Sequence, residues 1–122
     1  MKIFEKNNKV NFIDENNLLL GYNLEQDCCE DAGWFVADCL VSKTKFEGDS
    51  LSALADDWSG WLFDPDFFKE VEDEDCDNYV VAFRISKDGE EKFIHLYNVH
   101  NGYYSHNFHF SENAITIKDS YI

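Results

Sequence analysis

An Asn-Gly pair between two aromatic-rich runs constrains this chain more than any other feature. In the stretch Lys92–Phe110, Asn101-Gly102 separates two runs of aromatic and β-branched residues. Asn and Gly tolerate the positive φ angles of a type I′ turn, so the stretch predicts a tight β-hairpin. One face of this hairpin is almost wholly apolar and predicts a core face. The expected cross-strand partners are Val99 with Tyr104, Tyr97 with His106, His95 with Phe108 and Phe93 with Phe110.

Four further segments have the composition of strands. Val10–Ile13 and Leu18–Tyr22 flank a polar loop and predict a second hairpin. Tyr79–Ser86 predicts a strand that leads into the Asn-Gly hairpin, and Ala114–Ile122 predicts the last strand.

The turn before Lys92 can be predicted from the faces of the strands. A bulged turn at Gly89 places Phe83 opposite Phe93 and Val81 opposite His95. A two-residue turn would pair Arg84 with Phe93 and scatter apolar side chains over both faces. Because a one-residue shift moves every side chain to the other face, we expect the bulge.

Two segments show helical spacing. The first begins near Asp27, with Glu30 completing a capping box, although the run from Trp34 to Val41 also suits a buried strand. Its apolar positions are Cys28, Ala32, Phe35, Val36, Cys39 and Leu40. The second begins at Ser50 and ends before Pro65, with a further turn expected over Asp66–Val71. Its apolar positions are Leu51, Leu54, Trp58, Trp61 and Leu62.

These elements predict one α+β domain over residues 1–122. An antiparallel sheet of about five to six strands would carry two helices on its aromatic face. No apolar run is long enough to span a bilayer and the first ten residues lack the apolar stretch of a signal peptide, so we expect a cytoplasmic protein. The four cysteines fit reduced thiols in that compartment, which disfavours a Cys39–Cys76 disulfide.

Charge gives the main indication of function. Twenty-five acidic against ten basic residues give a net charge of −15, and Glu47–Asp77 alone holds twelve acidic residues and one lysine, a net of −11. Such a field repels nucleic acid and anionic membranes and attracts a basic protein, although solubility alone could also explain it. The predicted contact residues are Asp56, Asp57, Glu70, Glu72, Asp73, Glu74, Asp75 and Asp77.

Metal binding and catalysis have weaker support. His95 and His106 would form a diagonal pair on the hairpin, but two ligands are fewer than zinc requires. The run from Asp73 to Asn78 begins like an EF-hand loop, yet its twelfth position is Arg84 rather than glutamate, which leaves only weak divalent binding open. We therefore expect no cofactor, and an enzyme using Cys28 or Cys29 with a histidine is the third alternative.

Two motifs carry a resemblance over roughly Leu18–Phe110. The sequences QDCCE and NGYYS resemble a family of uncharacterised bacterial and phage proteins with no assigned activity. The resemblance implies a shared fold and a second candidate surface, whereas the Trp-rich middle and the acidic loop depart from the family pattern. The residues of this second candidate surface are Gln26, Asp27, Cys28, Cys29, Glu30, Tyr103 and Tyr104.

By size and charge the chain is also similar to immunity proteins of bacterial toxin systems. That resemblance implies an acidic inhibitor that covers the basic active site of a nuclease toxin. A phage-type inhibitor that mimics nucleic acid and blocks a defence nuclease is the near alternative.

Overall fold

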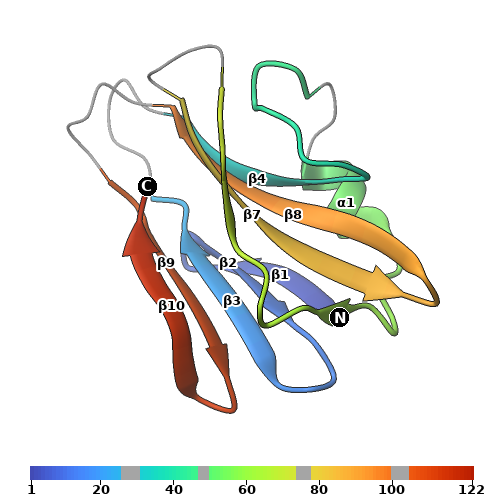
Figure 1. The fold of residues 1–122 in the computed structure, drawn as a ribbon. Coiled ribbons are helices and arrows are strands. Elements are labelled where there is room, and N and C mark those ends of the chain that lie inside the picture. The colour runs from blue at the N-terminus through green and yellow to red at the C-terminus, as the bar shows by residue number, and fades with distance from the viewer. Residues whose placement is uncertain (26–30, 47–49, 74–77, 100–104) are drawn as a thin grey trace.

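Two antiparallel β-sheets face each other across a common core (Figure 1). The computed structural model describes residues 1–25, 31–46, 50–73, 78–99 and 105–122. The first sheet has the order β1-β2-β3-β9-β10; its strands are β1 Lys2–Lys6, β2 Lys9–Ile13, β3 Leu18–Asn23, β9 Asn107–Glu112 and β10 Ile115–Tyr121. The second has the order β4-β8-β7-β5, with β6 also paired to β7; its strands are β4 Asp31–Ala37, β5 Leu62–Phe63, β6 Lys69–Val71, β7 Asn78–Lys87 and β8 Glu90–Val99.

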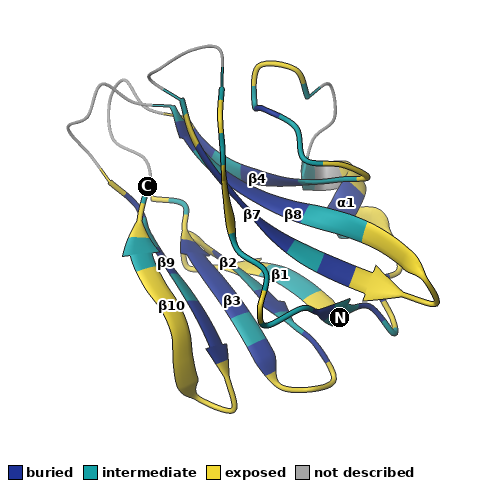
Figure 2. Cartoon of the chain, viewed as in Figure 1, coloured by how far each residue is buried: buried dark blue, intermediate teal, exposed yellow. Residues whose placement is uncertain are grey.

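The core lies between the two sheets. Inward-facing side chains of both sheets build it, as the dark blue bands along β3, β7 and β8 show in Figure 2. Phe12 of β2 meets Trp34 of β4 edge to face at 5.1 Å between ring centroids, and Phe83 of β7 packs against Phe110 of β9 at 5.0 Å. Aromatic pairs from opposite sheets therefore join the two layers.

The predicted α+β fold with two packed helices is wrong. The only helix among the described residues is α1, Ser50–Ala55, which is six residues long. The expected first helix is instead β4, in which Trp34 enters the core while Phe35 faces outward and is also buried. A strand buried on both faces has consecutive apolar residues, and these can also match a helical spacing.

The second predicted helix stops early. The Trp58 indole donates to the Ala53 carbonyl at 2.6 Å, and Gly60 has a φ of +83°, so the chain turns after α1. The tryptophans still enter the core, but from a turn that leads into β5. The expected further turn over residues 66–71 is also wrong, because Lys69–Val71 forms β6.

The predicted pairing of the two runs that flank Asn101-Gly102 is wrong. β8 pairs with β4 and β7, whereas β9 pairs with β3 and β10, so the two runs belong to different sheets. His95 lies opposite Phe35 and Ala82 instead of Phe108. Asn101 and Gly102 themselves lie outside the described residues. An alternating apolar strand fits any sheet face that needs one, so the pattern does not fix its partner.

The turn between β7 and β8 also differs from the prediction. Lys87 pairs with Glu90 across Asp88-Gly89, whose φ angles of +52° and +84° are those of a type I′ turn. Arg84 therefore pairs with Phe93, the register that the expected Gly89 bulge would have avoided. The prediction assumed that all apolar side chains lie on one face of the sheet. That assumption fails because the outward-facing Val80, Ala82 and His95 are buried as well.

Three strand predictions are confirmed. β7 contains the predicted strand Tyr79–Ser86, β10 lies within the predicted last strand, and β2 and β3 form the predicted first hairpin. The loop of that hairpin is organised by Asp14, which is 4% exposed. One oxygen of its carboxylate accepts the backbone N–H groups of Asn16 and Leu18, each at 2.9 Å, and the other accepts that of Phe63, also at 2.9 Å. Asp14 thus ties the first sheet to β5 of the second.

Candidate functional site

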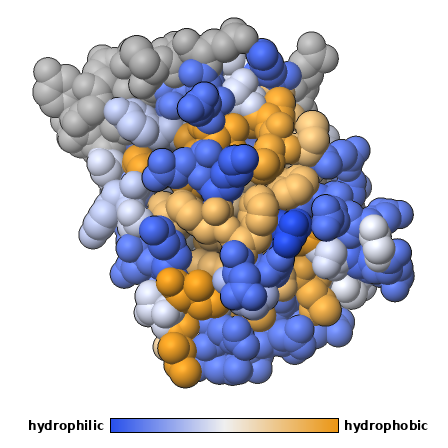
Figure 3. Space-filling model, in the orientation of Figure 1, coloured by the Kyte–Doolittle hydropathy of each residue, from blue (hydrophilic) through white to orange (hydrophobic). Residues whose placement is uncertain are grey.

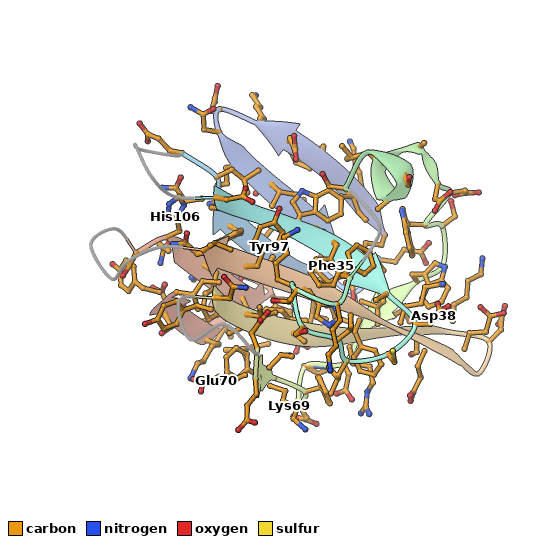
Figure 4. The ribbon with its side chains drawn as sticks, turned by 90° about the horizontal axis from the view of Figure 1, so that it is seen from above. Phe35, Asp38, Lys69, Glu70, Tyr97 and His106 are labelled. Atoms are coloured by element: carbon orange, nitrogen blue, oxygen red, sulfur yellow. The ribbon has the colours of Figure 1, made fainter. Side chains whose placement is uncertain are left out.

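The structure separates the described acidic residues of the predicted contact surface into two groups. Asp56 and Asp57 follow α1, which contacts β4 at one edge of the second sheet. Glu70 lies in β6 and Glu72 shortly after it, at the opposite edge beside β7. Figure 4 shows Lys69 and Glu70 projecting from that edge, away from Asp38. These residues therefore do not form one continuous patch.

Two of the predicted contact residues have internal partners. Asp57 accepts hydrogen bonds from the backbone N–H of Ser59 at 3.0 Å and from its hydroxyl at 2.6 Å, which lowers the pKa of the carboxyl. Asp73 accepts from the backbone N–H of Thr44 at 3.2 Å and from the Thr44 hydroxyl. Thr44 in turn accepts from the Asn78 amide at 3.2 Å. Asp73 therefore holds the segment around Thr44 against the start of β7.

Glu70 and Glu72 differ from these two residues. Both side chains are exposed, and neither makes a hydrogen bond or ion pair with another described residue. Two other carboxylates near the second sheet are paired, Asp64 with Arg84 and Asp38 with Lys92. Glu70 and Glu72 are therefore among the described carboxylates at the β7 side whose charge has no described partner.

An open groove lies next to Glu70, between the β6–β7 edge of the second sheet and β10 of the first. It has a volume of about 350 Å³ and is lined by Glu70, Val71, residues 78–81, Tyr121 and Ile122. Figure 3 shows the face that bears these edges, where apolar surface gathers between hydrophilic borders. A second opening of about 360 Å³ lies on the other side of β6, lined by Leu40 and residues 69–72. Glu70 and Val71 line both, so β6 forms a ridge between two grooves.

Sequence reasoning missed this groove. Tyr121 was placed in a strand but not in a site, and Val71 was expected in a helical turn. The available signal was the apolar alternation of β10, where Ile115, Ile117 and Tyr121 stay exposed. An edge strand that exposes several large apolar residues is a recognised feature of interaction surfaces.

The remaining predicted contact residues lie outside the described part of the chain. These are Glu74, Asp75, Asp77, Gln26, Asp27, Cys28, Cys29, Glu30, Tyr103 and Tyr104. The residues next to these segments do have a described position. Asp31, Val99 and Asn78 follow or precede the three segments and form one row across β4, β8 and β7. The described residues that flank the sequence motifs and the acidic loop therefore meet at the same end of the second sheet.

The predicted pairing of His95 with His106 is wrong. His95 lies on the outward face of β8, stacked on Phe35 at 4.4 Å, whereas His106 precedes β9 and is bonded to the Asn23 carbonyl at 2.7 Å. His95 is fully buried under the segment that follows β4. Its Nε2 accepts the Val41 N–H at 3.2 Å, and its Nδ1 lies 3.1 Å from the Phe93 carbonyl, to which it donates as the neutral tautomer. Burial lowers the pKa of His95 to about 4.

The outward face of the second sheet thus has a small aromatic cluster of its own. Phe35 stacks between Phe46, at 3.9 Å, and His95, and the Tyr97 ring lies beside it at 6.1 Å (Figure 4). Tyr97 covers Gly33, and burial together with the charge of Asp31 raises the pKa of Tyr97 to about 12. The cluster fixes the 38–46 segment and offers no accessible base.

The described ranges hold neither a metal-ligand cluster nor a membrane-spanning helix. They contain no group of three or more His, Cys, Asp or Glu side chains that could hold a metal ion. They also contain no helix with the length and apolar character of a membrane span. Asp75 and Asp77 of the EF-hand-like run fall outside these ranges, so that hypothesis is unchanged.

Comparisons with known proteins add no relative. No family model matches the chain, and neither the curated proteins nor the solved structures gave a significant match.

Proposed function

We propose that this protein is a small acidic inhibitor that binds a basic protein, as an immunity protein does when it neutralises a nuclease toxin. The observation that carries the proposal is the concentration of charge: residues 47–77 hold a net of −11 out of −15. Within that segment Glu70 and Glu72 stand exposed on and after an edge strand, without described partners. A charge placed this way accelerates encounter with a basic surface.

The internal bonds of Asp57 and Asp73 refine the contact surface. Both carboxylates stabilise loops, so the proposed surface centres on Glu70 and Glu72 and continues toward Glu74, Asp75 and Asp77. A reduced, exposed thiol at Cys39 is in keeping with a cytoplasmic protein, where such an inhibitor would meet its target.

The test compares two pairs of glutamates with equal charge change. The double variant Glu70→Gln/Glu72→Gln removes two charges at β6, and the control Glu15→Gln/Glu112→Gln removes two exposed charges from the first sheet. Partners captured from the source cell would be purified, and association rates measured against wild type across a range of salt concentrations. We expect the β6 variant to associate several-fold more slowly at low salt and the control to change much less.

Two sets of results would contradict the proposal. If a captured basic partner associates with both variants at the wild-type rate, or if its rate is independent of salt, the acidic edge is not the contact surface. If wild type captures no basic protein, the charge serves solubility and the inhibitor proposal fails. Protection of cells from a nuclease toxin by coexpression would extend the result from binding to neutralisation.

A further inference from the structure

The groove between β6 and β10 combines exposed aromatic surface with unpaired strand edges. Tyr79 is 44% and Tyr121 66% exposed, and both line the groove. Tyrosines supply large contact area at low entropic cost, which is why they are enriched at protein interfaces. Val71 and Ile122 add aliphatic surface, so both aliphatic and aromatic side chains line the groove.

The strands that border this groove each have an unpaired side. Among the described strands β6 pairs only with β7, and β10 pairs only with β9. An edge strand presents unpaired N–H and C=O groups that can pair with an extended segment of another chain. The register of β10 shifts between Thr116 and Lys118, so a regular edge is confined to residues 118–121 beside the groove.

Charge selects among the possible occupants. Glu70 lines the groove and Glu72 follows it, both without described partners, in a protein of net charge −15. Lys69 precedes Glu70 on β6, and one cation cannot neutralise both glutamates. Lys118 of β10 lies over the Phe68 ring, 4.8 Å from its centroid. An occupant with positive side chains beside an apolar one complements this arrangement.

A second copy of the chain is a poor occupant. In a two-fold dimer the same patch meets itself, so Glu70 and Glu72 of both copies would face each other at a net charge of −15 each.

We infer that this groove is the docking site for an extended segment of the basic partner, with a bulky apolar side chain seated against Tyr79 and Tyr121 and flanking lysine or arginine side chains paired with Glu70 and Glu72. The inference rests on the proposed function and adds to it the kind of segment that the partner must present. Its backbone would extend the β6 or β10 edge as an additional strand.

The experiment uses three defined peptides of equal length and the intact protein labelled with ¹⁵N. The first peptide alternates lysine with phenylalanine, the second alternates lysine with serine, and the third alternates glutamate with phenylalanine. We expect saturable shifts of the Val71, Val80 and Ile122 amides with the first peptide, and at least tenfold weaker binding of the other two. Tyr121→Ser and Val71→Ser should each weaken the first peptide at least tenfold, whereas Ile115→Ser should not. Ile115 is a matched control because it lies on β10, is 73% exposed and is outside the groove.

Each contrary result identifies which statement fails. If the lysine–serine peptide binds as tightly as the lysine–phenylalanine peptide, and Tyr121→Ser does not weaken it, the acidic residues attract the peptide but the groove is not its docking site. Equal binding of the glutamate–phenylalanine peptide would overturn the basic occupant. If no peptide shifts these amides at saturating concentrations, the groove is not a docking site. Thermal melting of every variant checks that the fold is retained.

Discussion

Acidification should destabilise this protein through His95. The ring is fully buried and neutral, and its pKa lies at about 4 instead of the ordinary 6.5. Between these values the unfolded chain binds a proton that the folded chain excludes, so stability falls as the pH drops from 6.5 toward 4 and is fully present above 6.5. A difference of roughly 2.5 pKa units corresponds to about 3 kcal/mol. That is a large share of the roughly 5–15 kcal/mol that stabilises an ordinary domain.

The assay must separate His95 from the many carboxylates that titrate in the same range. His95→Phe keeps an aromatic ring stacked on Phe35 and removes the titrating group, while the carboxylates stay the same. It also leaves the Val41 N–H without its acceptor, so we expect the variant to be less stable than wild type by about 1–3 kcal/mol at pH 7.

Urea unfolding, followed by tryptophan fluorescence, would be measured for both proteins from pH 7.5 to pH 4. The stability difference between them should move by about 2–3 kcal/mol in favour of His95→Phe over that range, because only wild type must exclude the proton. A difference that stays constant with pH would show that His95 is accessible or already protonated, and would refute the buried neutral ring.

Two further predictions concern packing and loop structure. Gly33→Ala should destabilise the domain by about 1–3 kcal/mol in thermal melting, because the new Cβ would lie 2.5 Å from the Tyr97 hydroxyl; an equal loss in a Tyr97→Ala background would contradict this reason. Asp14→Ala should cost more than about 2 kcal/mol in urea unfolding because three backbone N–H groups lose their acceptor, whereas Glu15→Ala should change stability by less than about 0.5 kcal/mol. A small loss for Asp14→Ala would show that water replaces the carboxylate.

Local signals predicted β2, β3, β7 and β10 correctly, but they gave the wrong partners for the strands on either side of Asn101-Gly102. The β2–β3 hairpin follows from two strand-like runs around a polar loop, all within fourteen or so residues of one another. The pairing of β3 with β9 and of β4 with β8 depends on which faces need covering, and this is a property of the whole chain. The error over the Asn-Gly hairpin has this cause, because a strong turn signal was taken to fix the partners of both flanking strands.

The helix errors have a second cause. A sheet whose outward face is partly covered has consecutive buried residues, as at Trp34 and Phe35, and loses the simple alternation that identifies a strand. The same covering of the outward face invalidated the argument for a bulge at Gly89. Gly33, within the segment predicted to be helical, suits the strand because it makes room for the ring of Tyr97 on the neighbouring strand.

The candidate site was predictable in charge but not in shape. Composition identified an acidic middle segment, and Glu70 and Glu72 remain in the proposed surface. The internal bonds of Asp57 and Asp73 could not be foreseen, because each depends on a loop position that tertiary contacts set. The groove brings β10 together with β6 and β7, from which it is distant in the sequence, so no local pattern could have predicted it.

The pairing of β3 with β9 has a consequence for biosynthesis. The first three strands can form a meander early, but the hydrogen-bonding edge of β3 stays open until β9 and β10 leave the ribosome. The middle of the chain, which builds the second sheet, is made during that interval and has no completed layer to pack on. Native assembly therefore waits for contacts of long sequence separation, which form slowly. During that delay the nascent chain exposes an apolar strand edge, and its high negative charge would keep neighbouring chains apart until the sheet closes.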